Sequence, residues 1–235
     1  MDRSTRLSEL ARVAAAEVRD GMLLGLGTGT TAAAVVREIG VRVAAGLRVS
    51  GVATSARTAA LARELGIPLL SFNQVERLDL GIDGADEIDP ELNVIKGGGG
   101  ALLHEKLVAL ACDDYLIVAS SEKLSPVLGT RFSLPAEVVS FGWPHTERRL
   151  RDLGLEATLR RDENGRPART DGGHFILDCA RQPIPNPAAL GVAIKEVIGV
   201  VDHGLFVGIA RRALIAEPDG AVRLMSRPNM ATPQL

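Results

Sequence analysis

The chain has no long hydrophobic run. Hydrophobic residues make up 46% of its 235 positions, yet no stretch of 18 or more consecutive apolar residues occurs, and a membrane-spanning helix needs about that length. Charged residues interrupt the first segment, 1–12, throughout, which is not typical of a secretory signal peptide. We therefore expect a cytoplasmic protein with no membrane partner.

Cysteine and net charge are also scarce. The two cysteines, Cys112 and Cys179, lie in apolar sequence and match no metal-ligand spacing, so we interpret them as reduced core residues. A formal net charge of −2 provides no basic surface for nucleic acid. These features predict a small-molecule ligand and no nucleic-acid partner.

Lysine is rare compared with arginine. Of the 27 basic residues, only Lys96, Lys106, Lys123 and Lys195 are lysines. Where a chain uses arginine for most of its cations, a remaining lysine indicates a need for a compact ammonium on a flexible stem. The alternative interpretation is that a lysine at any single position occurs there by chance.

Helices and strands alternate through the first half of the chain. This order is typical of a parallel sheet covered on both faces. The expected helices are 7–19, 30–39, 58–65 and 101–111, and the expected strands are 22–24, 47–53, 67–70, 78–82 and 115–119.

The pattern changes near residue 130. We expect strand 132–139, helix 145–153, strands 156–161 and 175–180, helix 187–197 and strand 199–202. The order β-α-β-β-α-β indicates a ferredoxin-like module. Segments 205–209 and 213–215 are expected to return to the first sheet, and the tail from Ser226 is expected to be mobile. The predicted fold is thus α/β, with a Rossmann-like catalytic domain (1–129 and 204–235) and a small α+β domain (130–203).

A glycine-rich loop, Gly25 to Thr31, lies between a strand and a helix. Its backbone N–H groups, threonine hydroxyls and helix dipole predict an anion site. The loop also fits G-x-G-x-x-A, but no acidic residue follows between Glu38 and Glu64 to hold a ribose, and no P-loop signature occurs. The phosphate of a small ligand is the favoured interpretation. A dinucleotide and a purely structural turn are the alternatives.

An acidic cluster, Asp83-Gly84-Ala85-Asp86-Glu87, follows the strand at 78–82. Open α/β sheets bind ligands at the carboxyl ends of their strands. Paired carboxylates there could handle hydroxyl protons or hold sugar hydroxyls. A capping turn is one alternative, and a divalent metal site, without any His or Cys, is another.

Four consecutive glycines follow Lys96 and precede the helix that carries Glu105. Such a run is conformationally costly and is useful where backbone lies against a ligand. Lys96 and Glu105 could therefore border one pocket, although Glu105 alone could equally be a surface acid. We interpret His104 as a bystander because its side chain points about 100° away from that of Glu105 on a helix.

These motifs, in this order, resemble the type A ribose-5-phosphate isomerase family. The matching segments are Gly27-Thr28-Gly29-Thr30-Thr31, Asp83-Gly84-Ala85-Asp86-Glu87, Lys96-Gly97-Gly98-Gly99 with Glu105, and Lys123. The resemblance covers residues 21–220, and it is looser at Ser55 and its neighbours in 54–58.

The resemblance implies a cofactor-free aldose–ketose isomerase of the non-oxidative pentose phosphate pathway, which assembles as a homodimer or homotetramer. It implies that Glu105 is the proton acceptor of a cis-enediolate mechanism, with Lys96, Asp83 and Asp86 as further catalytic residues. The implied substrate-binding residues are Thr28, Gly29, Thr30, Thr31, Asp83, Gly84, Ala85, Asp86, Lys96, Gly97, Gly98, Gly99 and Lys123.

One position departs from the family. Some members carry a phosphate-binding lysine in the first helix, where this chain has none, and Arg3, Arg6 or Arg12 could replace it. A related aminosugar-phosphate deaminase or lactonase, and a non-catalytic sugar-phosphate sensor, are the competing interpretations. A sensor that regulates transcription should carry a DNA-binding segment before the fold.

Overall fold

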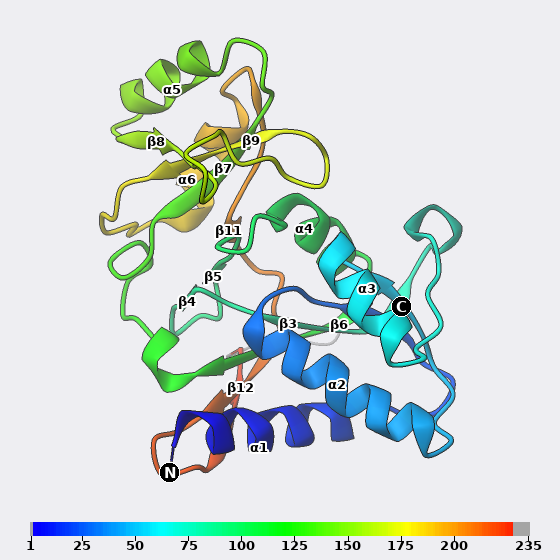
Figure 1. Ribbon diagram of the computed structural model, residues 1–235. Helices are drawn as coiled ribbons and strands as arrows, with labels where there is room; N and C mark the ends of the chain where they lie inside the picture. The colour runs from blue at the N-terminus through cyan, green and yellow to red at the C-terminus, as the bar shows by residue number, and fades with distance from the viewer. Residues whose placement is uncertain (1, 228–235) are drawn as a thin grey trace.

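A six-stranded, mostly parallel sheet forms the centre of the molecule, for which the computed structural model describes residues 2–227 (Figure 1). The strand order is β13-β12-β6-β3-β1-β2, and of these only β13 is antiparallel to its neighbour. The expected α/β class is confirmed. The strands are β1 (Leu23–Leu26), β2 (Ser50–Ala53), β3 (Leu78–Gly84), β6 (Cys112–Ser120), β12 (Arg212–Ala216) and β13 (Val222–Ser226).

Two apolar cores lie on opposite faces of this sheet, because side chains alternate along a strand. In β6, Leu116 and Val118 join the core formed with helices α1 and α2. Tyr115 and Ile117 join the other core, which includes Ala109 of α4. Tyr115 therefore lies on the same side of the sheet as α4. The helices are α1 (Arg3–Ala16), α2 (Thr30–Ala44), α3 (Ala56–Glu64) and α4 (Leu102–Leu110).

A four-stranded antiparallel sheet, at the upper left of Figure 1, has the strand order β10-β7-β9-β8. Its two helices begin at residues suited to a helix start. Pro144 lies in the first turn of α5, and the Asn186 side chain caps α6 by accepting from Ala189 N at 3.0 Å. The elements are β7 (Leu134–Val138), α5 (Trp143–Asp152), β8 (Ala157–Leu159), β9 (Phe175–Cys179), α6 (Pro187–Lys195) and β10 (Val200–His203).

A small third sheet joins distant parts of the chain. It has the order β11-β5-β4 and is antiparallel. The expectation that 205–209 returns to the first sheet is wrong, since Leu205 and Phe206 pair with Ile95 and Val94 and the left-handed Gly208 lies two residues after the strand. The strands are β4 (Glu87–Ile88), β5 (Val94–Ile95) and β11 (Leu205–Phe206), and the 3₁₀ turns are η1 (Phe72–Gln74) and η2 (Ser121–Lys123).

The expected strand at 67–70 is also wrong. Only Leu69 forms an isolated bridge, with Gly51, because the adjacent Pro68 has no N–H to extend a ladder. The antiparallel β13 was not expected. Most of the tail after Ser226 lies outside the described residues. No described helix is long and apolar enough to cross a membrane.

Candidate active site

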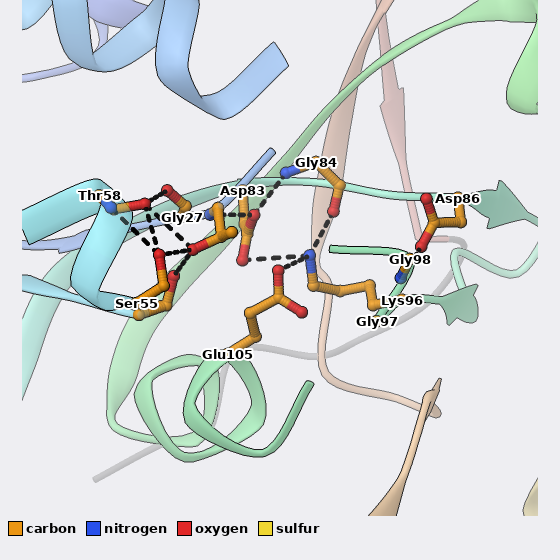
Figure 2. Close-up of polar contacts among 12 residues, drawn as sticks. Gly27, Ser55, Thr58, Asp83, Gly84, Asp86, Lys96, Gly97, Gly98 and Glu105 are labelled. Atoms are coloured by element: carbon orange, nitrogen blue, oxygen red, sulfur yellow. Dashed lines mark hydrogen bonds and ion pairs between the residues drawn. The ribbon is translucent and has the colours of Figure 1, made fainter. Parts of the chain in front are cut away.

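The motifs converge on one cavity at the carboxyl end of the parallel strands. It has a volume of about 160 Å³, and Figure 2 shows polar contacts among residues on and around its wall. Segments up to 120 residues apart in the sequence, from Arg3 to Lys123, meet there. The lining residues are Arg3, Thr28, Gly29, Thr30, Thr31, Gly84, Ala85, Asp86, Lys96, Gly97, Gly99, Glu105 and Lys123.

Lys96 lies at the centre of the contacts in Figure 2, immediately after β5. The residue is only 2% exposed, and its ammonium donates to the Gly84 carbonyl at 2.5 Å. It lies 3.1 Å from Asp83 Oδ2 and 3.3 Å from Glu105 Oε1. Burial alone would lower the pKa of Lys96, but the facing carboxylates outweigh it and raise this pKa above its ordinary value. The side chain is therefore a fixed cation.

Glu105 projects from the first turn of α4 toward Lys96. It is 4% exposed, and its second oxygen, Oε2, is buried without a hydrogen-bond partner among residues 2–227. Burial raises the pKa of Glu105 from 4.5 to about 8, although Lys96 opposes the rise. An unpaired carboxylate oxygen with a raised pKa beside a cavity is suited to accept a proton.

Asp83 is placed differently from the other acidic residues. It is the second-last residue of β3, is 1% exposed and is not on the cavity wall. Gly27 packs directly against it, since an ideal Cβ at that position would lie 2.3 Å from the Asp83 carboxyl carbon. Only glycine permits this approach. The carboxylate therefore lies behind Lys96 as seen from the cavity.

Asp86 does line the cavity. Its Oδ2 accepts from Gly98 N at 2.8 Å, which ties the acidic cluster to the glycine loop, at the right of Figure 2. On the other side of this loop, Arg160 donates to the carbonyls of Gly97 and Gly98 at 2.8 and 3.2 Å. Arg160 comes from the end of β8, so the four-stranded sheet helps to hold the glycine loop.

The hydroxyl of Thr28 is directed into a cluster of hydroxyl groups that includes Ser55 and Thr58, which lie at the left of Figure 2. It lies 2.7 Å from Thr54 Oγ1, 2.8 Å from Ser55 Oγ and 3.0 Å from Thr58 Oγ1. These partners belong to the segment 54–58, which the sequence matched only loosely to the family. The Thr28 hydroxyl is thus used to fix the loop.

Thr30 and Thr31 begin α2, whose N-terminus has no side-chain cap from the described residues. The first N–H groups of this helix are thus available to an anion. Both threonines also line a second chamber of about 570 Å³. This chamber adjoins the first cavity, and the residues common to both are Arg3, Thr30, Thr31, Ala85 and Lys123.

Of the three first-helix arginines, Arg3 is the one that lines the first cavity. Arg6 lines only the adjoining chamber, whereas Arg12 pairs with Glu9 on the surface. The sequence analysis named all three arginines without choosing between them, because the choice depends on how α1 crosses the sheet.

The sequence analysis did not identify two further residues near the site. Tyr115 contacts Asp83, and the ring of Phe206 lies under the Lys96 ammonium.

The described residues contain no group of three or more His, Cys, Asp or Glu side chains placed to hold a metal ion. Cys179 is buried and Cys112 half-buried, and both are free thiols. The absence of a cofactor remains a prediction.

A parallel α/β sheet that ends on a phosphate-sized loop, a buried lysine and a glutamate with one unpaired carboxylate oxygen is an arrangement suited to an enzyme that moves protons on small phosphorylated molecules. Comparison with known proteins then gives the family. The model described as ribose 5-phosphate isomerase A (phosphoriboisomerase A) matches residues 50–220. The chain belongs to the ribose 5-phosphate isomerase A family, as its motifs indicated.

Individual relatives are similar to this chain over almost its whole length. Ribose-5-phosphate isomerase A of Synechococcus sp. (strain JA-3-3Ab) is 52% identical over 212 residues, which cover 89% of this chain and 92% of that protein. The solved ribose 5-phosphate isomerase A of Methanocaldococcus jannaschii has a TM-score of 0.90 at 33% identity, over 96% of this chain and 100% of that one. A D-ribose-5-phosphate isomerase in complex with phospho-erythronic acid has a TM-score of 0.93 at 32% identity, over 97% and 100%.

Proposed function

We propose that this chain interconverts D-ribose 5-phosphate and D-ribulose 5-phosphate through a cis-enediolate, with Glu105 as the base. The observation that carries the proposal is the Glu105 carboxylate, which has one oxygen 3.3 Å from the Lys96 ammonium and the other buried without a partner among the described residues. Aldose–ketose isomerisation needs one group that takes a proton and returns it to the neighbouring carbon.

The reaction conserves all atoms and electrons. Ionised Glu105 removes the proton from C2 of the open-chain aldose, and the C2–H electron pair forms the C1–C2 double bond while the carbonyl oxygen gains negative charge. Lys96 stabilises that oxygen as a preorganised cation. Glu105-H then returns the proton to C1, and the C2 hydroxyl becomes the ketone as its proton moves to the C1 oxygen.

We assign hydroxyl-proton transfer and ring opening to Asp86 in preference to Asp83. Asp86 lines the cavity, whereas Asp83 does not. A free carboxylate oxygen on the wall can exchange protons with a sugar hydroxyl within hydrogen-bond reach. Gly84, Ala85 and the glycine loop would then shape the pocket around the sugar.

The phosphate is assigned to the region shared by the two cavities, at the N-terminus of α2. Backbone N–H groups and the hydroxyls of Thr30 and Thr31 provide donors there, and Lys123 and Arg3 provide cations. Arg3 would replace the first-helix lysine of other family members.

The finer predictions about organisation belong to the same proposal. Residues 130–203 would form a ferredoxin-like domain, which the element order β7-α5-β8-β9-α6-β10 supports. The enzyme would act in the cytoplasm, without metal or cofactor, as a homodimer or homotetramer.

A direct assay tests the function and separates its competitors. Purified protein is incubated with ribose 5-phosphate in D₂O and followed by NMR. Ketose formation with deuterium entering at the exchanged carbon is expected. Ammonia release from an aminosugar phosphate, or lactone hydrolysis, without ketose formation would favour the related enzymes. Binding without turnover would favour a sensor.

A further inference from the structure

Asp83 has no free lone pair for a substrate. Its Oδ1 accepts from the backbone N–H groups of Thr28 and Gly84 at 3.1 and 2.7 Å. Its Oδ2 accepts from the Tyr115 hydroxyl at 3.2 Å and faces the Lys96 ammonium at 3.1 Å. A carboxylate offers about four acceptor positions, and here the protein occupies all of them. Asp83 could exchange a proton with a ligand only after losing one of these donors.

Tyr115 is the only tyrosine in the chain. It is 3% exposed and lies on β6, next to β3. Its ring packs against Gly81, where a Cβ would lie 2.7 Å from the ring carbon Cδ2. Glycine at position 81 therefore lets the hydroxyl reach Asp83. Burial raises the pKa of Tyr115 well above 10, and the neighbouring Asp83 and Glu105 add to the rise, so the phenol remains a hydrogen-bond donor at neutral pH.

We propose that Tyr115 is a positioning residue for the isomerase reaction, which acts through Asp83 to hold the Lys96 ammonium at Glu105. In this arrangement Asp83 is an anchor for the lysine and carries no substrate proton. The inference rests on the proposed isomerase function.

Without the tyrosine hydroxyl, Oδ2 of Asp83 would have Lys96 as its one remaining donor. The ammonium would then be drawn toward Asp83 and away from the oxygen on which the enediolate charge develops. Stabilisation by Lys96 would therefore weaken for the negatively charged enediolate, and much less for the neutral carbonyl of the bound substrate.

The test compares Tyr115→Phe with wild type in kcat, KM and affinity for phospho-erythronic acid. The carboxylate of this ligand carries a full negative charge at the end of a phosphorylated chain and so imitates the charged intermediate. We expect kcat and the affinity for this acid each to fall about ten-fold, as for a lost hydrogen bond to a charged group, with KM within about two-fold of wild type.

Ile117→Val is the matched control. Ile117 is fully buried on the same face of β6, so the variant loses packing and leaves the Asp83 contacts in place. Its Tm should fall slightly while kcat and inhibitor affinity stay at the wild-type level. Equal loss in both variants, or a Tyr115→Phe enzyme within two-fold of wild type in kcat and inhibitor affinity, would overturn the proposal. An inactive wild type would instead contradict the isomerase function.

The single tyrosine provides a second, spectroscopic readout. The ultraviolet absorbance of phenolate should appear only well above pH 10 in the native protein, and at a lower pH in Asp83→Asn, because the neighbouring negative charge is gone. An unchanged titration in Asp83→Asn would show that the phenol does not donate to Asp83, and the proposal would be wrong.

Discussion

Glu105 has a carboxylate that is almost completely withdrawn from water yet only half paired. Oε1 faces Lys96 at 3.3 Å, and Oε2 has no partner among the described residues. A buried charge without full pairing is costly, so burial disfavours the ionised form of Glu105. Burial raises the pKa of Glu105 to about 8, so its carboxylate is a stronger base than that of an ordinary glutamate.

Glu105→Gln should abolish most turnover and leave substrate binding nearly intact. The amide keeps the shape of the side chain but cannot accept the C2 proton, and loss of a general base costs about 10²–10⁴-fold in rate. Steady-state kinetics with ribose 5-phosphate would measure the effect. A variant that keeps more than about half of the wild-type kcat would remove Glu105 from this role.

Arg3→Met should raise KM for the phosphorylated sugar by about ten-fold with a smaller change in kcat, since the phosphate is bound alike in the ground and transition states. Inorganic phosphate should also inhibit this variant less well than wild type. Arg12→Met is the control, because Arg12 lies on the same helix but is exposed and pairs with Glu9. Equal KM values in the two variants would place the phosphate away from Arg3.

The sequence predicted the motif residues that meet at the cavity but not how each one is used. The place of Asp83 behind Lys96 depends on donors from Thr28 and Tyr115, which are 55 and 32 residues away. Such contacts follow from strand order and register, and local sequence patterns carry no signal for them. Arg3 could be named as one of three candidates only because the expected lysine was missing.

Helix α4 is fixed on two sides. Glu105 points into the cavity, whereas the adjacent Lys106 donates to Asp202 Oδ1 and the His203 carbonyl, each at 2.6 Å. Its ammonium also lies 5.0 Å from the centre of the Phe206 ring, which Lys96 approaches at 5.7 Å. One buried ring thus contacts two of the four lysines, and β10 of the antiparallel sheet holds the helix that carries the base.

Lys106→Met should lower both stability and activity. It leaves Asp202, with a side chain 15% exposed, without its close partner, which we expect to cost about 2–3 kcal/mol in free energy of unfolding. Looser attachment of α4 should also reduce kcat. Urea unfolding and kinetics would measure the two effects. In Lys195→Met, the control, a 47% exposed lysine 3.8 Å from the same carboxylate is lost, and the change should stay below about 0.5 kcal/mol.

Short elements were the least predictable from sequence. Each strand of the third sheet has two residues, which is too few to show a periodicity. The long apolar run of β6, by contrast, was recognised because burial on both faces requires it. Helix starts were also predictable to within a few residues, as at Pro187, where local capping chemistry determines them.

At the scale of the whole molecule, the ionisation of Glu105 links activity to stability. Its pKa is about 8 in the folded chain and about 4.5 in the unfolded one. The stability contributed by neutral Glu105 is therefore fully present below about pH 4.5 and is lost as the pH rises through 8. Lys96, Asp83, Asp86 and Tyr115 face this group.

Glu105→Gln should accordingly stabilise the fold in alkaline solution. Near pH 8.5 we expect a gain on the order of 2–4 kcal/mol, which should shrink toward zero near pH 4.5. Thermal unfolding of both proteins at the two pH values would measure it. A pH-independent difference in Tm would mean that Glu105 has an ordinary pKa.

The kcat/KM of the wild type should rise with pH through the same ionisation, because the base must be unprotonated.

The scarcity of lysine has a practical consequence for handling the protein. Lys96 and Lys106 are buried, Lys123 is half-buried at the cavity and Lys195 is exposed on α6. Among the lysines, a limiting amount of an amine-reactive dye should therefore react mainly at Lys195. A fluorophore or surface linker attached there would lie on the antiparallel-sheet part of the molecule, and its signal could report on that part without a cysteine being engineered.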